Sequence, residues 1–389
     1  MSGASQQAPA AEPNRAGRRV AILLSYSGDG GVERMLNQLM RAMLAAGCAV
    51  DLLVLKARGG HFAGVPAGVR VLRLDSGHAR LAVRHIARYL RAEQPPVLLA
   101  AKDRAGRAAL QARDRAGVRT RVFIRLGNTL SESLVGRGRL RRWLRYAAIR
   151  RTWPRADGII AVSHGVAEDV VATSGVAPER VHVLANPVVT PELFERAAAA
   201  PEHEWPQIAG EPVIVGAGRL DRQKDFPTLL RAFARLNAQT PAHLVILGEG
   251  EDRGALERLA VELGVGERVR LPGFVANPHA TMARADLFVL SSAWEGSPNV
   301  LTEALALGVP VVATDCRSGP REILAGGRVA PLVPVGDDAA MATAMAEVLR
   351  APPASATLQA AVGDYECDRA TARYLQVLGV ADVLESSPE

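Results

Sequence analysis

The chain has 389 residues, of which 48% are hydrophobic and 22% charged, and a formal net charge of +7. Residues 1–188 carry 30 Lys and Arg against 13 Asp and Glu, whereas the remainder carries 17 against 27, which favours two domains with different surroundings. This composition excludes a disordered chain, and no apolar run reaches the roughly 18 residues that a membrane span needs. Cys48, Cys316 and Cys367 are too widely spaced to indicate a disulfide framework or a zinc site.

Residues 1–17 are small and polar, so we expect a disordered tail in place of a signal peptide, and a cytoplasmic protein. Apolar runs typical of strands then recur at 20–25, 49–55, 69–74, 97–101, 121–126 and 158–163. After an Asn-Pro turn the pattern resumes at 211–218, 242–250, 268–273, 285–291 and 309–314.

Helical stretches separate these runs, and strands that alternate with helices predict parallel sheets covered on both faces. We expect an α/β protein with two doubly wound domains, 18–187 and 188–355, facing across a cleft. Residues 356–389 are expected to form a helical segment that packs back toward the first domain. Ligands of such sheets bind beyond the carboxyl ends of the strands.

The first strand is followed by a loop with Gly28, Gly30 and Gly31, and then by a helix. A dinucleotide site would need an acid at the end of the second strand, where Lys56 stands instead. The loop therefore indicates either a backbone that approaches a ligand closely or only a tight turn.

The loop after the run at 211–218 holds Arg219 and Lys224. Lys224 is one of only three lysines, and a lysine provides the compact charge that often binds phosphate. The alternative is a solvated loop. The later loop at 270–278, which includes Phe274, is a candidate surface for a flat ring.

The stretch WEGSPNVLTEALALGVPVVAT at 294–314 places two acids, Glu295 and Glu303, in an apolar region. Ser297 fits a helix N-cap and Pro298 the first helical position. The backbone N–H groups of Asn299, Val300 and Leu301 would then be free to bind an anion. Gly296 and Ser297 lie on the same candidate donor-binding loop.

Together these loops offer cations, a helix N-terminus and two carboxylates, which suits a nucleotide diphosphate sugar. Each phosphate–cation contact contributes on the order of 4 kcal/mol before desolvation, so a diphosphate can be held without metal. No Asp-x-Asp pair occurs, and we expect neither metal nor cofactor.

The motifs resemble those of the family 4 retaining glycosyltransferases (glycosyl transferases group 1, GT-B fold). EGSPNVLTE matches their E-x7-E motif, GRLDRQK their G-R-L…K element, GDGGVER their Gly-Gly loop and ANPV their interdomain turn. The resemblance implies that Glu295 contacts the transferred sugar, Glu303 the ribose, and Arg219 and Lys224 the diphosphate. Gly30 and Gly31 would let the acceptor domain close on the donor.

Two positions depart from the family pattern. Asp225 replaces the glycine usual after the lysine, and Asn128 stands near a position where many members have a histidine. Asn128 is therefore an acceptor-side candidate only. The family implies retention, with the leaving phosphate accepting the proton of the acceptor.

Residues 136–155 contain eight arginines and no acid. On a helix, Leu140, Trp143, Leu144, Ala147 and Ala148 share one face and Arg141, Arg142 and Arg145 lie opposite, which is typical of a membrane-surface element. The alternative is that the apolar face packs on its own domain. RNA binding is disfavoured because only 4% of residues are aromatic.

We therefore predict a retaining hexosyltransferase that uses a nucleotide diphosphate sugar, UDP-linked by preference. The acceptor would be a glycan or lipid-linked glycan of lipopolysaccharide or exopolysaccharide synthesis, at the inner face of the cytoplasmic membrane. The alternatives are a sugar-nucleotide epimerase or phosphorylase on the same fold, or a protein that binds a sugar nucleotide without transfer.

Overall fold

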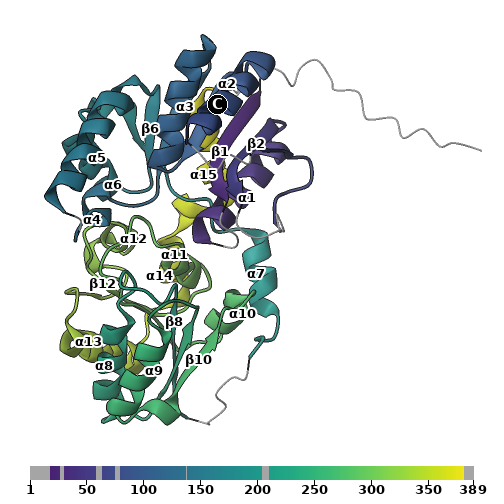
Figure 1. The fold of residues 1–389 in the computed structure, drawn as a ribbon. Coiled ribbons are helices and arrows are strands. Elements are labelled where there is room, and N and C mark those ends of the chain that lie inside the picture. The colour runs from purple at the N-terminus through teal and green to yellow at the C-terminus, as the bar shows by residue number, and fades with distance from the viewer. Residues whose placement is uncertain are drawn as a thin grey trace, which may run out of the picture. The chain divides into compact units, whose positions relative to one another are not determined.

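A computed structural model describes residues 18–26, 30–57, 64–74, 79–136, 138–203 and 210–380. The predicted tail over 1–17, Gly28 and the last nine residues of the predicted C-terminal segment lie outside these ranges. By its internal contacts the chain divides into two compact units (Figure 1). The first comprises residues 1–125, 148–160 and 371–389, and the second 126–147 and 161–370.

The first sheet has seven strands within the described residues, in the order β3-β2-β1-β4-β5-β6-β7. Its pairings from β3 to β5 are parallel. The strands are β1 Arg19–Tyr26, β2 Ala49–Ala57, β3 Arg70–Arg73, β4 Val97–Ala101, β5 Arg121–Leu126, β6 Gly158–Ala161 and β7 Val181–Val183. The helices between and after them are α1 Gly31–Ala45, α2 Ala79–Glu93, α3 Asp103–Ala116, α4 Leu130–Ser133, α5 Arg139–Thr152, α6 His164–Ser174 and α7 Pro191–Ala198.

The second sheet has six strands in the described residues, in the order β10-β9-β8-β11-β12-β13, and its pairings are parallel. The strands are β8 Val213–Ala217, β9 His243–Leu247, β10 Val269–Gly273, β11 Leu287–Leu290, β12 Val311–Thr314 and β13 Leu332–Val333. The helices are α8 Phe226–Asn237, α9 Arg253–Glu262, α10 Pro278–Met282, α11 Asn299–Ala306, α12 Pro320–Ile323, α13 Asp338–Arg350, α14 Ser355–Ala360 and α15 Cys367–Leu378.

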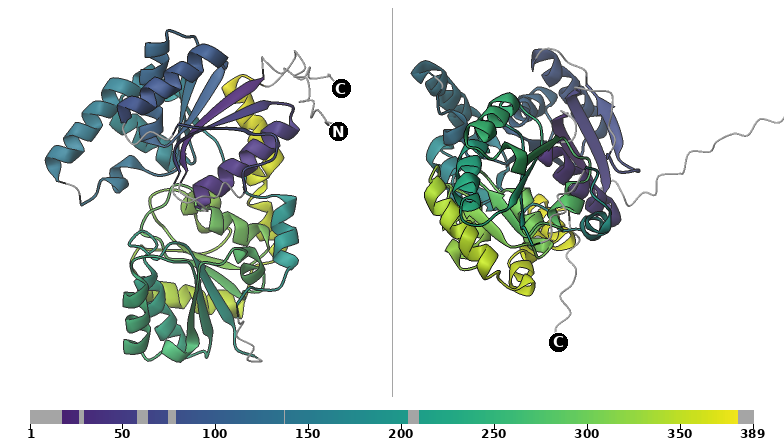
Figure 2. Two further views of the ribbon diagram at one scale, coloured as in Figure 1. Left: turned by 45° about the vertical axis from the view of Figure 1, so that its right-hand side comes forward. Right: turned by 90° about the horizontal axis from the view of Figure 1, so that it is seen from below.

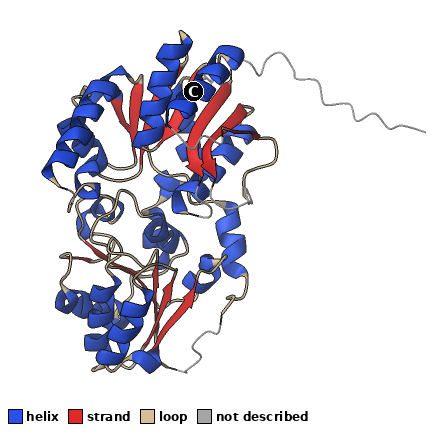
Figure 3. Cartoon of the chain, viewed as in Figure 1, coloured by secondary structure: helices blue, strands red, loops and turns tan. Residues whose placement is uncertain are grey.

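Helices cover both faces of the second sheet (Figure 3) because its strands bury alternate side chains in two separate clusters. Ile214 and Leu244 point to the face that α8, α9 and α13 cover. Val215 and Phe288 point to the opposite face, covered by α11, α12 and α14. The parallel order and the two covered faces confirm the predicted doubly wound architecture.

The sequence pattern found most of these strands and missed two. The expected Asn-Pro turn follows a stretch, 181–183, for which the pattern predicts no strand, yet Val181–Val183 joins the first sheet as β7. The two-residue β13 was not predicted at all, because a strand this short has no periodicity to detect.

The C-terminal helix α15 contributes to the first unit from residue 371 onward. The Arg125 guanidinium donates from Nε to the Tyr374 hydroxyl at 3.1 Å, and Arg121 donates from Nη2 to the Leu378 carbonyl at 2.6 Å. In Figure 2 this helix, drawn in yellow, lies beside the purple N-terminal strand. None of the helices in the described ranges has both the length and the apolarity to cross a bilayer.

Candidate functional site

The loop that joins β8 to α8 carries Lys224 into the interior of the second unit. Gly218, at the start of this loop, has a φ of +157°, and a Cβ there would lie 2.7 Å from Lys224 Cε. A side chain at this position would therefore displace the lysine stem. The Ser291 hydroxyl fixes the backbone by donating to the Lys224 carbonyl at 2.7 Å.

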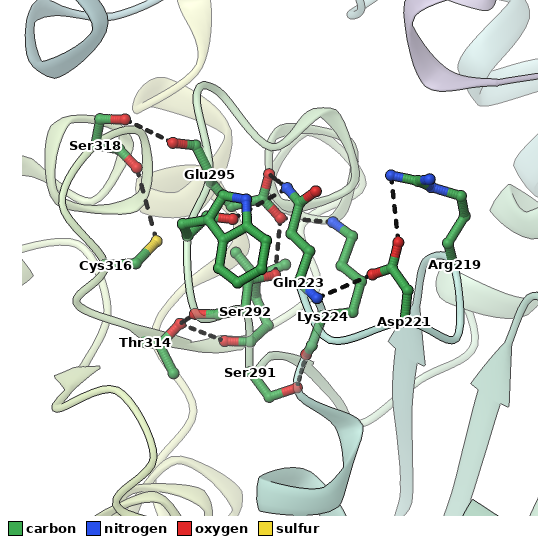
Figure 4. Close-up of polar contacts among 12 residues, drawn as sticks. Arg219, Asp221, Gln223, Lys224, Ser291, Ser292, Glu295, Thr314, Cys316 and Ser318 are labelled. Carbon is green, nitrogen blue, oxygen red and sulfur yellow. Dashed lines mark hydrogen bonds and ion pairs between the residues drawn. The ribbon is translucent and has the colours of Figure 1, made fainter. Parts of the chain in front are cut away.

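Glu295 is the carboxylate on which the polar contacts of this region converge (Figure 4). It is 6% exposed, and its Oε1 accepts from Lys224 Nζ at 2.6 Å and from the Ser292 hydroxyl at 2.7 Å. Gln223 Nε2 donates to the Trp294 carbonyl at 3.0 Å and approaches Glu295 Oε2 at 3.4 Å. The carboxylate is thus buried, compensated by a cation and fixed in orientation.

The backbone that carries Glu295 is fixed as well. The Ser318 hydroxyl donates to the Glu295 carbonyl at 2.7 Å, and Cys316 lies beside this pair. Burial first, and the charge of Glu295 second, raise the pKa of the Cys316 thiol to about 12. The thiol therefore stays protonated at neutral pH.

Arg219 lies in the same loop but does not reach Glu295. Its side chain is 76% exposed, and its guanidinium pairs with Asp221 at 3.3 Å, away from the buried carboxylate (Figure 4). An exposed pair of this kind contributes only about 0–1 kcal/mol, so little opposes a change of partner when an anion arrives.

Asp225 explains one departure from the family pattern. It has a φ of +46° and a ψ of 45°, the left-handed conformation that glycine adopts without strain. The Thr228 hydroxyl donates to its carboxylate at 2.7 Å, and this local bond offsets part of the strain. The departure thus affects the turn before α8.

Helix α11 begins one residue later than expected. Its cap is Pro298, with an extended ψ of 103°, so Ser297 is not the cap and Pro298 is not the first helical residue. The Leu301 N–H donates to the Pro298 carbonyl at 3.1 Å, which corrects the expectation that this amide is free. Asn299 also bonds Asn186 of the Asn-Pro turn, accepting from its Nδ2 at 2.8 Å.

Glu303 lies in the second turn of α11 with 13% of its side chain exposed. Its Oε2 faces Nε2 of His279, on α10, at 3.5 Å. The two predicted acids therefore occupy separate environments, since Glu295 has Lys224 as its partner and Glu303 faces a buried imidazole.

The other candidates of this region are distributed around the β11–α11 loop. Gly296 has no room for a side chain, because a Cβ there would lie 2.0 Å from the Gly127 carbonyl oxygen in the same unit, with Asn128 next to it. Phe274 follows β10 and is 59% exposed, so its ring is open to a partner. In the described part of the chain no three His, Cys, Asp or Glu side chains are grouped to hold a metal ion.

Gly30 and Gly31 belong to the first unit. Gly30 caps α1, and a Cβ there would lie 2.6 Å from the Glu33 carboxylate. Gly31 is the first residue of α1 and has open space at its Cβ position.

Sequence reasoning missed four side chains that shape the site: Gln223, Ser292, Ser318 and His279. Gln223 stands directly before Lys224 in the GRLDRQK motif, so its position in the sequence could have indicated a place at the site. Ser292 and Ser318 are ordinary polar loop residues, and nothing in their spacing distinguishes them.

Two family models match this chain. The model for glycosyl transferases group 1 covers residues 211–351, and that for the glycosyl transferase 4-like domain covers residues 30–187. Together they span most of the chain, and each holds one of the two sheets almost completely.

Two curated relatives show how far the similarity extends. The N-acetylgalactosamine-N,N'-diacetylbacillosaminyl-diphospho-undecaprenol 4-alpha-N-acetylgalactosaminyltransferase of Campylobacter jejuni is 37% identical over 190 residues, which is 49% of this chain and 50% of that protein. The chain thus spans about half the length of this relative. The lipopolysaccharide core biosynthesis glycosyltransferase LpsE of Rhizobium meliloti is 29% identical over 365 residues, 91% of this chain and 97% of LpsE.

Solved structures share the fold at low identity. The lipopolysaccharide outer core galactosyltransferase WaaB superposes with a TM-score of 0.71 at 19% identity, covering 93% of this chain and 99% of WaaB. Anabaena HepE, solved with UDP and glucose, gives a TM-score of 0.72 at 18% identity over 92% of this chain and 99% of HepE. The chain is therefore a GT-B glycosyltransferase and belongs to the glycosyl transferases group 1 family.

Proposed function

We propose that the protein transfers a hexosyl or N-acetylhexosaminyl group, with retention, from a nucleotide diphosphate sugar to a glycan or lipid-linked glycan. The observation that carries this proposal is the buried Lys224–Glu295 pair at 2.6 Å, with α11 starting four residues after Glu295. Burying a charge pair costs folding free energy because both groups lose their hydration. A role of the pair in the reaction would explain why the protein keeps it.

Each group of the pair has a role in the proposed reaction. The Lys224 ammonium has three N–H donors, of which Glu295 accepts one, so the others are available for phosphate oxygens. Glu295 then lies where the diphosphate ends and the sugar begins. The amides of Asn299 and Val300 at the start of α11, together with Arg219, would complete the diphosphate site.

The proposed transfer balances without a base from the protein. The bond between the anomeric carbon and the β-phosphate oxygen breaks, and the acceptor hydroxyl oxygen bonds to the same face of that carbon. The proton of the hydroxyl passes to the departing phosphate oxygen. Lys224 and the α11 amides stabilise the charge that develops on the diphosphate, so no metal or cofactor is required.

For the donor we propose a UDP-linked sugar, and for the acceptor a lipid-linked glycan of lipopolysaccharide or exopolysaccharide synthesis. HepE has been solved with UDP, and the names of the relatives from C. jejuni and R. meliloti refer to a diphospho-undecaprenol acceptor and to lipopolysaccharide core biosynthesis. Phe274, exposed after β10, and the loop residues Gly296 and Ser297 would line the donor. Asn128, beside Gly296, would face the acceptor.

We also propose that the protein works on the inner face of the cytoplasmic membrane, through α5. Leu140, Trp143 and Leu144 are 69%, 64% and 53% exposed, so this apolar face is not packed on the described part of the chain. The helix is anchored instead by Ile149 and Thr152, which are buried. Arg141 and Arg142 of the same helix are also exposed, while Arg145 is half-buried.

A panel of sugar nucleotides that varies base and sugar tests the proposal. Purified protein is incubated with each donor and a lipid-linked glycan, and mass spectrometry follows the product. We expect one donor to give a glycosylated acceptor. NMR of this product should show the same anomeric configuration, axial or equatorial, as in the donor. An inverted product would refute retention. Conversion of the donor's sugar to its epimer in the absence of acceptor would indicate an epimerase. Donor binding without any turnover would indicate a binding protein.

A further inference from the structure

The side chain of His279 is buried beside the proposed donor site without an evident role in folding. His279 is the second residue of α10, its residue exposure is 6%, and its Nε2 lies 3.5 Å from Glu303 Oε2. Among the residues that the structure describes, neither ring nitrogen has a hydrogen-bond partner. Burial of an imidazole in this way is unfavourable, because its lost bonds to water are not replaced.

The helix that carries His279 is fixed from the side of α7. Asn277, the cap of α10, donates from Nδ2 to the Arg196 carbonyl at 2.8 Å, and Arg196 donates back to the Ala276 carbonyl. Arg284, just beyond the helix, donates to the Ala197 carbonyl at 3.2 Å. These bonds hold both ends of α10, so the backbone of His279 has little freedom to move.

Glu303 projects from α11 toward this fixed imidazole. A carboxylate has about four lone-pair sites on two oxygens, and two of them are needed to accept from the two hydroxyls of a ribose. A hydrogen bond donated to one lone pair of Oε2 limits rotation of the carboxylate. The lone pairs that remain then point in a fixed direction. His279 Nε2 lies on the Oε2 side at a distance that a small carboxylate rotation converts into a hydrogen bond.

We infer that His279 is a positioning residue for ribose recognition, which donates from Nε2 to Glu303 and orients its carboxylate toward the two ribose hydroxyls. This inference rests on the proposed function, since it assumes that Glu303 binds the ribose of the donor. His279 itself touches neither the sugar nor the reacting atoms. It therefore affects donor binding and leaves the chemical step unchanged.

The test compares UDP with 2′,3′-dideoxy-UDP, which lacks both hydroxyls, by isothermal titration calorimetry on the full chain. If the sugar-nucleotide screen selects another base, the diphosphate and the 2′,3′-dideoxy diphosphate of that nucleoside replace UDP and dideoxy-UDP. The wild type should bind UDP more tightly than the dideoxy compound. His279→Leu, which keeps bulk and removes the donor, should weaken UDP binding about tenfold and leave dideoxy-UDP binding unchanged.

Two further variants separate positioning from packing. His279→Gln retains a side-chain N–H donor and should restore most of the preference for UDP. In the double variant His279→Leu/Glu303→Gln, the loss of UDP affinity should be smaller than the sum of the single losses on the free-energy scale, because both substitutions remove the same interaction. With substrate, His279→Leu should raise the KM for the donor and leave kcat unchanged.

The outcomes distinguish the inference from the function on which it rests. Equal weakening of UDP and dideoxy-UDP by His279→Leu would show that His279 only supports packing, as would additive losses in the double variant, and either result overturns the inference. A wild type that binds no nucleoside diphosphate overturns the proposed donor site, and the role of His279 with it. Thermal melting of each variant identifies any that has lost its fold, and His279→Gln then decides the question.

Discussion

The proposed chemistry of the site depends on two carboxylates that the structure places in different surroundings. Glu295 is 6% exposed and bonded to a lysine, a serine and, at longer range, a glutamine. Glu303 is 13% exposed at the side chain, and its Oε2 faces Nε2 of the His279 ring at 3.5 Å. A carboxylate next to a cation that binds phosphate suits the reaction centre, and one at the imidazole suits a neutral part of the donor.

Glu295→Gln should therefore lower kcat by a large factor and change donor affinity little. Glutamine keeps the volume, and its amide oxygen can still accept from the Ser292 hydroxyl, but it removes the charge beside the transferred sugar. Stopped assays for kcat and calorimetry with donor measure the two effects. Glu262→Gln, an exposed acid at the end of α9, is the matched control. Loss of donor binding with kcat retained would contradict the assignment of Glu295 to the reaction centre.

Glu303→Ala should show the reverse pattern, with weaker nucleotide binding and a kcat that recovers at saturating donor. The physical reason is that ribose contacts are made equally in the ground state and the transition state, so their loss raises KM alone. Competition binding with UDP gives the affinity. If kcat falls at saturation while UDP affinity is unchanged, Glu303 does not bind the ribose.

At this scale the sequence predicts which loops lie at the same edge of the sheet and not how their side chains meet. Lys224 and Glu295 lie 71 positions apart and still bond, because they follow β8 and β11, which are neighbours in the sheet. The rule that ligands bind beyond the carboxyl ends of parallel strands was enough to expect this. The proposed role of His279 is out of reach of the sequence, since no spacing rule tells which residue of the short helix α10 points inward.

Among the elements, strand β2 contains an acid in the core of the first unit. Asp51 is 3% exposed and accepts from Arg70 at 2.7 Å and 2.9 Å and from the Tyr89 hydroxyl at 2.7 Å. Arg19 approaches the same carboxylate at 3.4 Å. The carboxylate thus links β2 to β1, β3 and α2, and burial together with Asp51 raises the pKa of Tyr89.

Asp51→Ala should destabilise the protein by about 1–3 kcal/mol, because it leaves the buried Tyr89 hydroxyl without its partner. Urea unfolding followed by circular dichroism measures the loss. Arg88→Ala, on the exposed side of α2, is the control and should change stability by less than about 0.5 kcal/mol. A loss below about 1 kcal/mol for Asp51→Ala would show that water takes over the hydrogen bonds of the carboxylate and that these bonds contribute little to stability.

Element boundaries show where local sequence signals stop. The cap of α11 was displaced by one residue because serine and proline both suit a helix start, and the extended ψ of Pro298 decides between them. For α5, the periodicity gave the composition of each face but not its exposure. Ile149, off the predicted apolar face, is buried together with Thr152. Which side of a short amphipathic helix meets the core depends on contacts far along the chain.

For the molecule as a whole, the donor site is proposed to work without metal. The cations Lys224 and Arg219 and the start of α11 would hold the diphosphate, and activity should therefore survive millimolar EDTA. Initial rates with and without the chelator measure this. Rates that fall with EDTA and return with Mg²⁺ or Mn²⁺ would reveal a metal requirement and contradict the proposed diphosphate site.

The whole protein should also bind anionic vesicles through α5, with a steep dependence on salt. Each arginine near an anionic surface contributes roughly 1 kcal/mol, and salt screens this attraction over about 8 Å at physiological ionic strength. Arg141→Glu/Arg142→Glu should abolish sedimentation with phosphatidylglycerol vesicles, and Trp143→Ala should weaken it in a less salt-dependent way. Arg231→Glu, exposed on α8, is the matched control.

The same charge-reversed variant separates membrane docking from catalysis. Transfer to a short water-soluble acceptor should stay near the wild-type rate, because Arg141 and Arg142 are not among the residues proposed to hold the donor. Transfer to a lipid-linked acceptor in vesicles should fall in parallel with sedimentation. If the variant still sediments with vesicles, the open face formed by Leu140, Trp143 and Leu144 serves some other contact, and a soluble acceptor becomes the better proposal.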